Sequence, residues 1–237
     1  MKRTLLHTII GLVYFLAAVS INFSMLADVV ENTSTSPVPL KRIDVPFPWV
    51  ATSEISGYTE ALIEVNNEGI VGDIVILKST HRAFSLAVIN TVSKTEFQPA
   101  VKDGQPVAAR LIIKNHFISD RHVTVRKIGE KTRPYWVDER TVKSLVFGPL
   151  DLDQPLVRIE TTAPIYPEDL MQTNLAGGVL IEFFIDEKGS VRAPTIISSS
   201  HEAFSESALE AIRLWKFSPP KSRGDPVTVR ARQQLNF

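Results

Sequence analysis

The last eleven residues of the chain alternate between apolar and polar side chains. Because successive side chains of a strand point to opposite faces, this alternation predicts one long strand with an apolar face and a polar, solvent-facing face. Gln233 is the one polar residue on the apolar face. The apolar face carries Val227, Val229, Ala231, Leu235 and Phe237, and the polar face carries Thr228, Arg230, Arg232, Gln234 and Asn236.

A hairpin is expected upstream of this strand. The run from Val179 to Asp186 is apolar, β-branched and aromatic, which favours a strand. Gly189 suits a tight turn that needs a positive φ, and the stretch from Ser190 to Ser199 reads as the returning strand. Pro194 cannot donate a ladder hydrogen bond, so it suits an edge or a bulge.

A helix is expected between the hairpin and the last strand. Ser205 is the predicted N-cap, with Phe204 packing on Leu209 as a hydrophobic staple. Leu209, Ile212 and Trp215 recur at helical spacing and predict one buried stripe. We interpret Trp215 and Phe217 as core residues rather than as a ligand platform.

The same order occurs earlier in the chain, displaced by 120 positions. Its strands are expected over 60–65, 70–79 and 107–117, and its helix follows Ser85, with Phe84 packing on Ile89. Each repeat therefore predicts a small antiparallel three-stranded sheet with one packed helix, in the order strand, strand, helix, strand, and an α+β fold class. Identities between the repeats include Gly57/Gly177, Gly69/Gly189, His81/His201, Phe84/Phe204 and Phe117/Phe237.

Five segments follow from these patterns. Residues 1–27 are expected to be a signal peptide or an N-terminal membrane anchor, because Lys2 and Arg3 precede a stretch without charge, and the anchoring portion would be 9–27. Residues 28–44 form a linker, 45–117 a degenerate first repeat, 118–155 a connector, and 156–237 the second repeat. The connector is expected to pack against one repeat as a tether, with a docking role as the alternative.

Composition narrows the function classes. The 26 basic and 26 acidic residues balance, so no nucleic acid partner is expected. There is no cysteine, and the five histidines lack metal-ligand spacing, so no metal and no cofactor are expected. His81 and His201 each follow a serine by two residues, but no acidic partner completes a triad, and we interpret them as polar turn residues of a protein that is not an enzyme.

The second repeat resembles the C-terminal domain of the TonB family of periplasmic energy transducers, and the first repeat resembles the same domain in degenerate form. The motifs that carry the resemblance are Ala163-Pro164-Ile165-Tyr166-Pro167, Gly177-Gly178, Ala203-Phe204-Ser205 and Trp215-Lys216-Phe217-Ser218-Pro219. The chain is thus expected to hold two tandem TonB C-terminal-like domains. The first copy has Thr95 in the place of Trp215 and lacks the Tyr-Pro pair.

The resemblance implies a periplasmic binding protein in energy-dependent transport. Its partner would be an extended segment of an outer-membrane transporter, added as a strand to an exposed sheet edge, which is β-augmentation. An inner-membrane motor complex would be a further partner if the N-terminal segment stays as an anchor. Transferred by motif position, the peptide-binding residues would be Pro164, Tyr166, Pro167, Val227, Val229, Arg230, Ala231, Arg232, Gln233 and Leu235.

Two questions stay open from the residues alone. Arg230 and Arg232 suit recognition of an acidic partner and equally suit protection of an edge strand against aggregation. The alternative function is structural: a periplasmic assembly protein that forms a homodimer by pairing its sheet edges.

Overall fold

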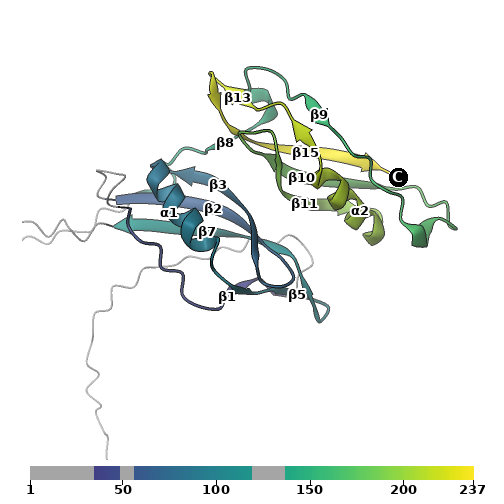
Figure 1. Cartoon of the computed structure of the whole chain (residues 1–237), viewed down its shortest axis with the longest axis horizontal. Helices are drawn as coiled ribbons and strands as arrows, with labels where there is room; N and C mark the ends of the chain where they lie inside the picture. The colour runs from purple at the N-terminus through teal and green to yellow at the C-terminus, as the bar shows by residue number, and fades with distance from the viewer. Residues whose placement is uncertain (1–34, 49–55, 119–136) are drawn as a thin grey trace, which may run out of the picture.

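The first repeat forms a three-stranded antiparallel sheet of order β3-β2-β7 with the helix α1 on one face (Figure 1). The computed structural model describes residues 35–48, 56–118 and 137–237, so the expected leader lies outside the described residues. The elements are β1 (Val38–Pro39), β2 (Ser56–Val65), β3 (Val71–Ser79), α1 (Arg82–Val92), β4 (Phe97–Gln98), β5 (Ala100–Lys102), β6 (Gln105–Val107) and β7 (Ala109–Ile118).

The second repeat has the same three strands and one helix, and its sheet gains a fourth strand from the connector. The order is β11-β10-β15-β8, in which β8 pairs parallel to β15. The fold class is therefore α+β, as predicted. The elements are β8 (Val146–Phe147), β9 (Arg158–Glu160), β10 (Gly178–Ile185), β11 (Val191–Ser199), α2 (Glu202–Arg213), β12 (Lys216–Phe217), β13 (Lys221–Ser222), β14 (Asp225–Pro226) and β15 (Thr228–Asn236), with short 3₁₀ turns at Pro149–Asp151 and Glu168–Leu170.

Both helices begin earlier than the sequence pattern predicts. Their N-caps are His81 and His201, whose Nδ1 atoms accept the backbone N–H groups of Ala83 and Ala203 at 3.1 and 3.3 Å. The prediction of Ser85 and Ser205 as caps was wrong, and so were the staples built on it. An imidazole nitrogen can satisfy a free amide of the first turn as a hydroxyl does, although histidine is not a common cap.

A glycine, a helix phenylalanine and a strand phenylalanine form the same packing unit in both repeats. Phe84 lies 4.4 Å from Phe117 between ring centroids, and Phe204 lies 4.4 Å from Phe237. A Cβ atom on Gly57 would come within 2.1 Å of the Phe84 ring, and one on Gly177 within 2.6 Å of the Phe204 ring. The identities between the repeats therefore preserve the space for the helix ring.

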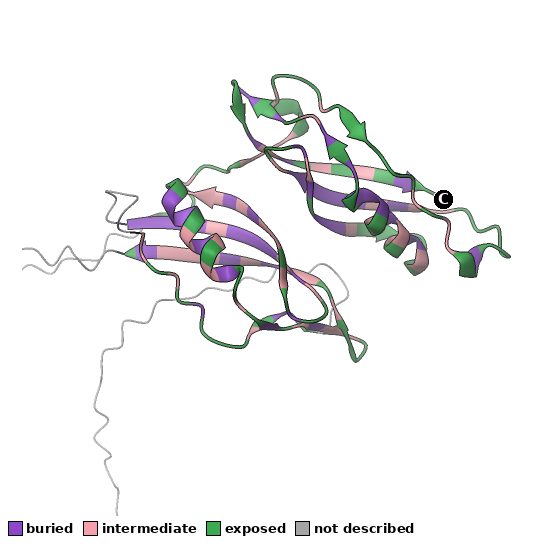
Figure 2. Cartoon of the chain, viewed as in Figure 1, coloured by how far each residue is buried: buried purple, intermediate pink, exposed green. Residues whose placement is uncertain are grey.

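The core of each repeat lies between its sheet and its helix (Figure 2). Trp215 is buried and its Nε1 donates to the carbonyl of Thr162 at 2.8 Å, which fits its prediction as a core residue. It follows the end of α2 at Arg213, however, so it does not continue the helical stripe. Pro194 lies in the outer strand β11 beside a break in register, as its missing N–H predicts.

The two repeats pack together through the sheet faces that do not carry the helices. On β2, Ala61 and Ile63 belong to the core under α1, whereas Leu62 points the other way into a separate cluster with Phe184 of β10. This cluster joins the repeats: Leu62, Val75 and Leu77 come from the first, and Phe184 and Ala193 from the second.

Part of the connector holds the repeats together at their edges. Leu145 N–H donates to the carbonyl of Leu77 at 2.8 Å on β3, and the next two residues form β8 on β15. Glu139 lies 3.1 Å from Lys114 Nζ and 2.8 Å from the buried hydroxyl of Tyr58. The described part of the connector is therefore a tether, as expected, but it contacts both repeats rather than one.

Candidate functional site

The strand β15 presents part of its backbone to an open edge. Gly177 and Phe237 exchange both of their backbone hydrogen bonds, at 3.2 and 2.9 Å, and β15 then pairs with β10 without a shift in register. Because antiparallel pairs alternate between bonded and non-bonded, the N–H and C=O groups of every second residue point away from β10. Those residues are Arg230, Arg232, Gln234 and Asn236.

The strand β8 covers the start of this edge. Val146 and Phe147 pair with Thr228 and Val229, which lie before the outward-facing positions just named. This strand was not predicted, because two residues are too few to show a period. Beyond β8, no strand pairs with the outer side of β15 among the described residues, so the edge from Arg230 to Asn236 is open.

The two arginines expected at the edge lie on the helix-free face of the sheet. The Arg230 guanidinium stacks over the ring of Phe184 at 5.4 Å, and Arg232 pairs with Glu182 at 2.9 Å. Phe184 and Glu182 are their direct partners on β10, so both contacts are ordinary cross-strand pairs. The arginine side chains therefore run over their own sheet, although both remain exposed.

The other predicted residues of β15 face the helix. Val229 and Leu235 belong to the core, Ala231 packs against it, and Gln233 is half-buried. Val227 is buried directly before the strand begins. Their side chains stabilise the domain, and the backbone N–H and C=O groups of Val229, Ala231, Gln233 and Leu235 are directed to β10. An incoming strand would therefore bond to the residues between them rather than to these.

The motif from Ala163 to Pro167 is linked to the far end of β15 through the core. Tyr166 lies 5.6 Å from Phe204 between ring centroids, and Phe204 stacks on Phe237. The Tyr166 hydroxyl donates to the carbonyl of Leu175 at 2.8 Å, which fixes the loop before β10. Pro164 and Pro167 are half-buried on either side. This segment is thus linked to Phe237, which follows the last residue of β15, through the Phe204 ring, and it does not pair with the edge of the strand.

A charge network crosses the interface between the repeats. Glu182 is buried and accepts from Arg232, while Arg110 of β7 lies 3.9 Å from its other oxygen. Arg110 also donates to the carbonyl of Ala193 at 3.1 Å. Burial lowers the pKa of Arg110, Glu182 and Glu64 oppose that shift, and Arg230 adds to it. This network was not predicted, because its members are brought together only by packing of the repeats.

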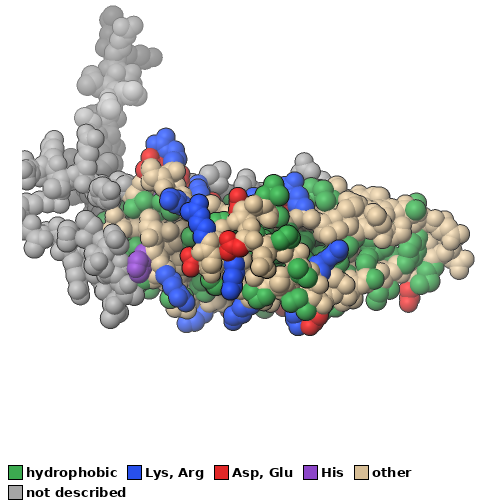
Figure 3. All heavy atoms as spheres, turned by 90° about the horizontal axis from the view of Figure 1, so that it is seen from above, with side chains coloured by type: hydrophobic (Ala, Val, Ile, Leu, Met, Phe, Trp, Pro, Cys, Tyr) green, Lys and Arg blue, Asp and Glu red, His purple; other side chains and the backbone are tan. Residues whose placement is uncertain are grey.

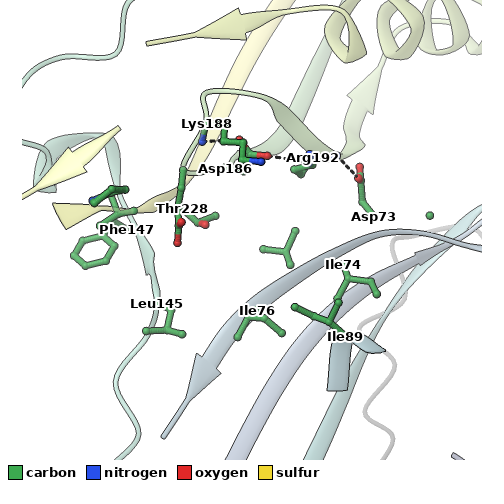
Figure 4. Close-up of a pocket in the computed structure, with 15 residues that line it drawn as sticks. Asp73, Ile74, Ile76, Ile89, Leu145, Phe147, Asp186, Lys188, Arg192 and Thr228 are labelled. Atoms are coloured by element: carbon green, nitrogen blue, oxygen red, sulfur yellow. Dashed lines mark hydrogen bonds and ion pairs between the residues drawn. The ribbon is translucent and has the colours of Figure 1, made fainter. Parts of the chain in front are cut away.

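A cavity of about 590 Å³ lies beside the same interface (Figure 4). Its apolar wall includes Ile74, Ile76 and Phe147, and its rim holds Arg192 between the carboxylates of Asp73 and Asp186 at 3.3 and 2.9 Å. No serine or histidine is among the described residues that line it. His81 and His201 cap helices elsewhere.

The described ranges contain no group of three or more His, Asp and Glu side chains placed to bind a metal ion. No helix in these ranges has both the length and the apolar character to cross a membrane. On the face seen in Figure 3, basic and acidic side chains lie among one another, with hydrophobic side chains between them.

Comparison with known proteins decides the family. The family model described as "Gram-negative bacterial TonB protein C-terminal" matches residues 48–118 and again 162–237. The chain belongs to this TonB C-terminal family. The two matches cover both repeats, including the copy that lacks the Tyr-Pro pair and the tryptophan.

One curated relative and one solved structure are similar to this chain over about the length of one repeat. Protein TonB of Vibrio cholerae serotype O1 is 34% identical over 90 residues, which are 38% of this chain and 37% of that protein. The chain thus spans little more than a third of this curated relative. The solution structure of the Pseudomonas aeruginosa TonB C-terminal domain aligns with 36% of this chain and 87% of its own, at 22% identity and a TM-score of 0.31.

Proposed function

We propose that the chain is a periplasmic TonB-like binding protein that takes up an extended peptide of an outer-membrane transporter along the open edge of β15. The observation that carries this proposal is the order β11-β10-β15-β8, in which no described strand pairs with the outer side of β15 beyond the two residues covered by β8. Unpaired N–H and C=O groups of an edge strand are a template for an incoming strand.

The geometry limits the length of the bound segment. The open edge runs from Arg230 to Asn236, and at about 3.3 Å per residue this is roughly 20 Å. The incoming strand would begin after Phe147 of β8 and end near Phe237. The exposed parts of Arg230 and Arg232 would lie beside its side chains on one face, so an acidic residue there would be favoured.

Membership in the TonB family supports a place in energy-dependent transport. We place the chain in the periplasm, either soluble after cleavage of a signal peptide or held in the inner membrane by residues 9–27. The anchored form would have an inner-membrane motor complex as a second partner. The mass of the mature protein separates the two forms, because only the anchored one retains its amino end.

A titration tests the binding proposal. Residues 28–237 are titrated with peptides from the amino-terminal ends of outer-membrane transporters of the same cell, and binding is followed by amide chemical shifts. The expected result is saturable binding with the largest shifts from Arg230 to Asn236. Absence of binding at millimolar peptide would reject the proposal.

The same edge offers the alternative function. Two copies that pair their β15 strands would form a homodimer and serve in assembly rather than transport. Sedimentation at high protein concentration distinguishes these uses, because a monomer at all concentrations leaves the edge free for a peptide.

A further inference from the structure

A second open edge lies at the other side of the second sheet. β11 is its outer strand, and no described strand pairs with the outer side of β11. A groove of about 820 Å³ runs along Pro194 to Ser199. Leu209 and Arg213 of α2 line one wall, and residues 107–110 of the first repeat line the other. Both repeats are needed to form this groove.

The groove is open at one end and closed at the other. Ile197 is 40% exposed and the serines that follow it are exposed, so the edge from Ile196 to Ser199 is accessible. Towards the start of β11, Ala193 is held by the first repeat and Pro194 has no N–H to offer. The accessible edge is therefore about four residues long, or roughly 13 Å, and it includes Ile197, an extra residue without a partner on β10.

The closed end carries an excess of positive charge. The Glu182 carboxylate forms ion pairs with two guanidinium groups, that of Arg232 at 2.9 Å and that of Arg110 at 3.9 Å. Arg110 lines the groove, its side chain is only 10% exposed, and its buried Nε has no hydrogen-bond partner. Since burial makes an incompletely compensated charge costly, a carboxylate brought to this end would be stabilised.

The other charges of the groove are already matched. Lys102 pairs with Glu202 at 3.7 Å, and Arg213 pairs with Glu64, and each pair joins the two repeats. These pairs hold the walls at the sides of the groove. Arg110 differs from Lys102 and Arg213, because it shares its carboxylate partner, Glu182, with a second guanidinium group, that of Arg232.

We propose that this groove binds an extended acidic segment of a partner protein, which adds as a strand to β11 between Ile196 and Ser199 and places a carboxylate beside Arg110. The site is separate from the β15 edge and does not depend on it. It gives the first repeat a role in binding, because that repeat supplies Arg110 and one wall.

Labelled model peptides test the site on the full chain. The probes are acetyl-Glu-Thr-Val-Thr-Val and its counterpart with lysine in place of glutamate, and binding is measured by fluorescence anisotropy. The acidic probe should bind at least tenfold more tightly than the basic one. Ile197→Glu should weaken the acidic probe about tenfold, whereas the matched Ile197→Lys, which loses the same apolar contact, should not weaken it.

Two further variants locate the probe. Arg110→Gln should weaken the acidic probe about tenfold, and Gln234→Pro, on the β15 edge, should leave its affinity unchanged. Equal affinities for the two probes, or equal effects of the two substitutions at Ile197, would overturn the proposal. So would a loss caused by Gln234→Pro alone, which would place the probe on β15. If circular dichroism shows that Arg110→Gln does not fold, the Ile197 pair decides.

Discussion

Asp73 and Ala193 occupy equivalent positions in the two repeats, and they are bonded to each other: Asp73 Oδ2 accepts the backbone N–H of Ala193 at 2.7 Å across 120 residues. Ala193 has a φ of +43°, a left-handed conformation that is unfavourable for a residue with a Cβ. Its carbonyl accepts from Arg110. The first repeat therefore binds both sides of a strained residue in the second.

Removing this acceptor should destabilise the joined repeats. Asp73→Ala leaves the buried N–H of Ala193 unsatisfied and should lower the free energy of unfolding by about 1–3 kcal/mol. Asp73→Asn keeps an oxygen for this N–H and loses only the charge opposite Arg192, so it should lose less. Urea unfolding of the full chain measures both. Equal losses would mean that the ion pair with Arg192, rather than the amide bond, matters here.

Two glycines with the same backbone conformation should respond differently to alanine. Gly189 has φ +84° and Gly224 has φ +86°, so both substitutions meet left-handed strain of about 1–2 kcal/mol. A Cβ on Gly189 would also lie 1.9 Å from the carbonyl oxygen of Phe217, whereas nothing lies within 4 Å at Gly224. Gly189→Ala should therefore cost about 3 kcal/mol or more, and Gly224→Ala about 1.

Thermal and urea unfolding of the two glycine variants give the comparison directly. Similar losses at both positions would show that the carbonyl of Phe217 moves away at little cost. The same contact occurs in the first repeat between Gly69 and Phe97, also at 1.9 Å, so Gly69→Ala should repeat the result.

The histidine caps make a third prediction. His201→Ala removes the acceptor for Ala203 N–H and should lower the free energy of unfolding by about 1 kcal/mol. His201→Asn keeps a side-chain acceptor of common cap type and should be close to neutral. If His201→Ala unfolds at the same urea concentration as the natural chain, the imidazole contributes nothing as a cap.

The stability of the fold should depend on pH because of His116 in the first repeat. Burial lowers the pKa of His116, with Glu139 opposing the shift and Lys114 adding to it, and its ring lies 4.8 Å from that of Tyr58. The unfolded chain keeps the ordinary pKa of about 6.5, so below that pH it takes up a proton that the folded state resists. Stability should therefore fall as the pH drops from about 7 through 6.5.

The matched variant is His116→Gln, which cannot titrate. Its urea midpoint should fall less between pH 7.5 and pH 5.5 than that of the natural chain. An identical fall in both proteins would assign the acid sensitivity to other groups.

Local patterns predicted the strands and the repeats but not the contacts between the repeats. The alternation before Phe237 and the turn at Gly189 act within a few residues, so they are visible in the sequence. The role of His201 as a cap was missed because imidazole is an uncommon acceptor at that position. Arg110 and Glu182 meet only when two sheet faces pack, and β8 is too short to show a period. The open edge itself was expected, but not its limit at Val229.

The edge of β15 offers a proline test that separates binding from folding. The N–H of Gln234 points away from β10, so Gln234→Pro removes a donor for an incoming strand while leaving the ladder intact. Gln233 is one residue away and its N–H points to Ile181, so Gln233→Pro breaks a ladder bond instead. We expect Gln234→Pro to unfold at nearly the natural urea concentration and to bind transporter peptides at least tenfold more weakly. Gln233→Pro should lose stability itself. Full peptide affinity in a folded Gln234→Pro variant would exclude strand addition at this edge, since the missing donor lies in the middle of the open stretch.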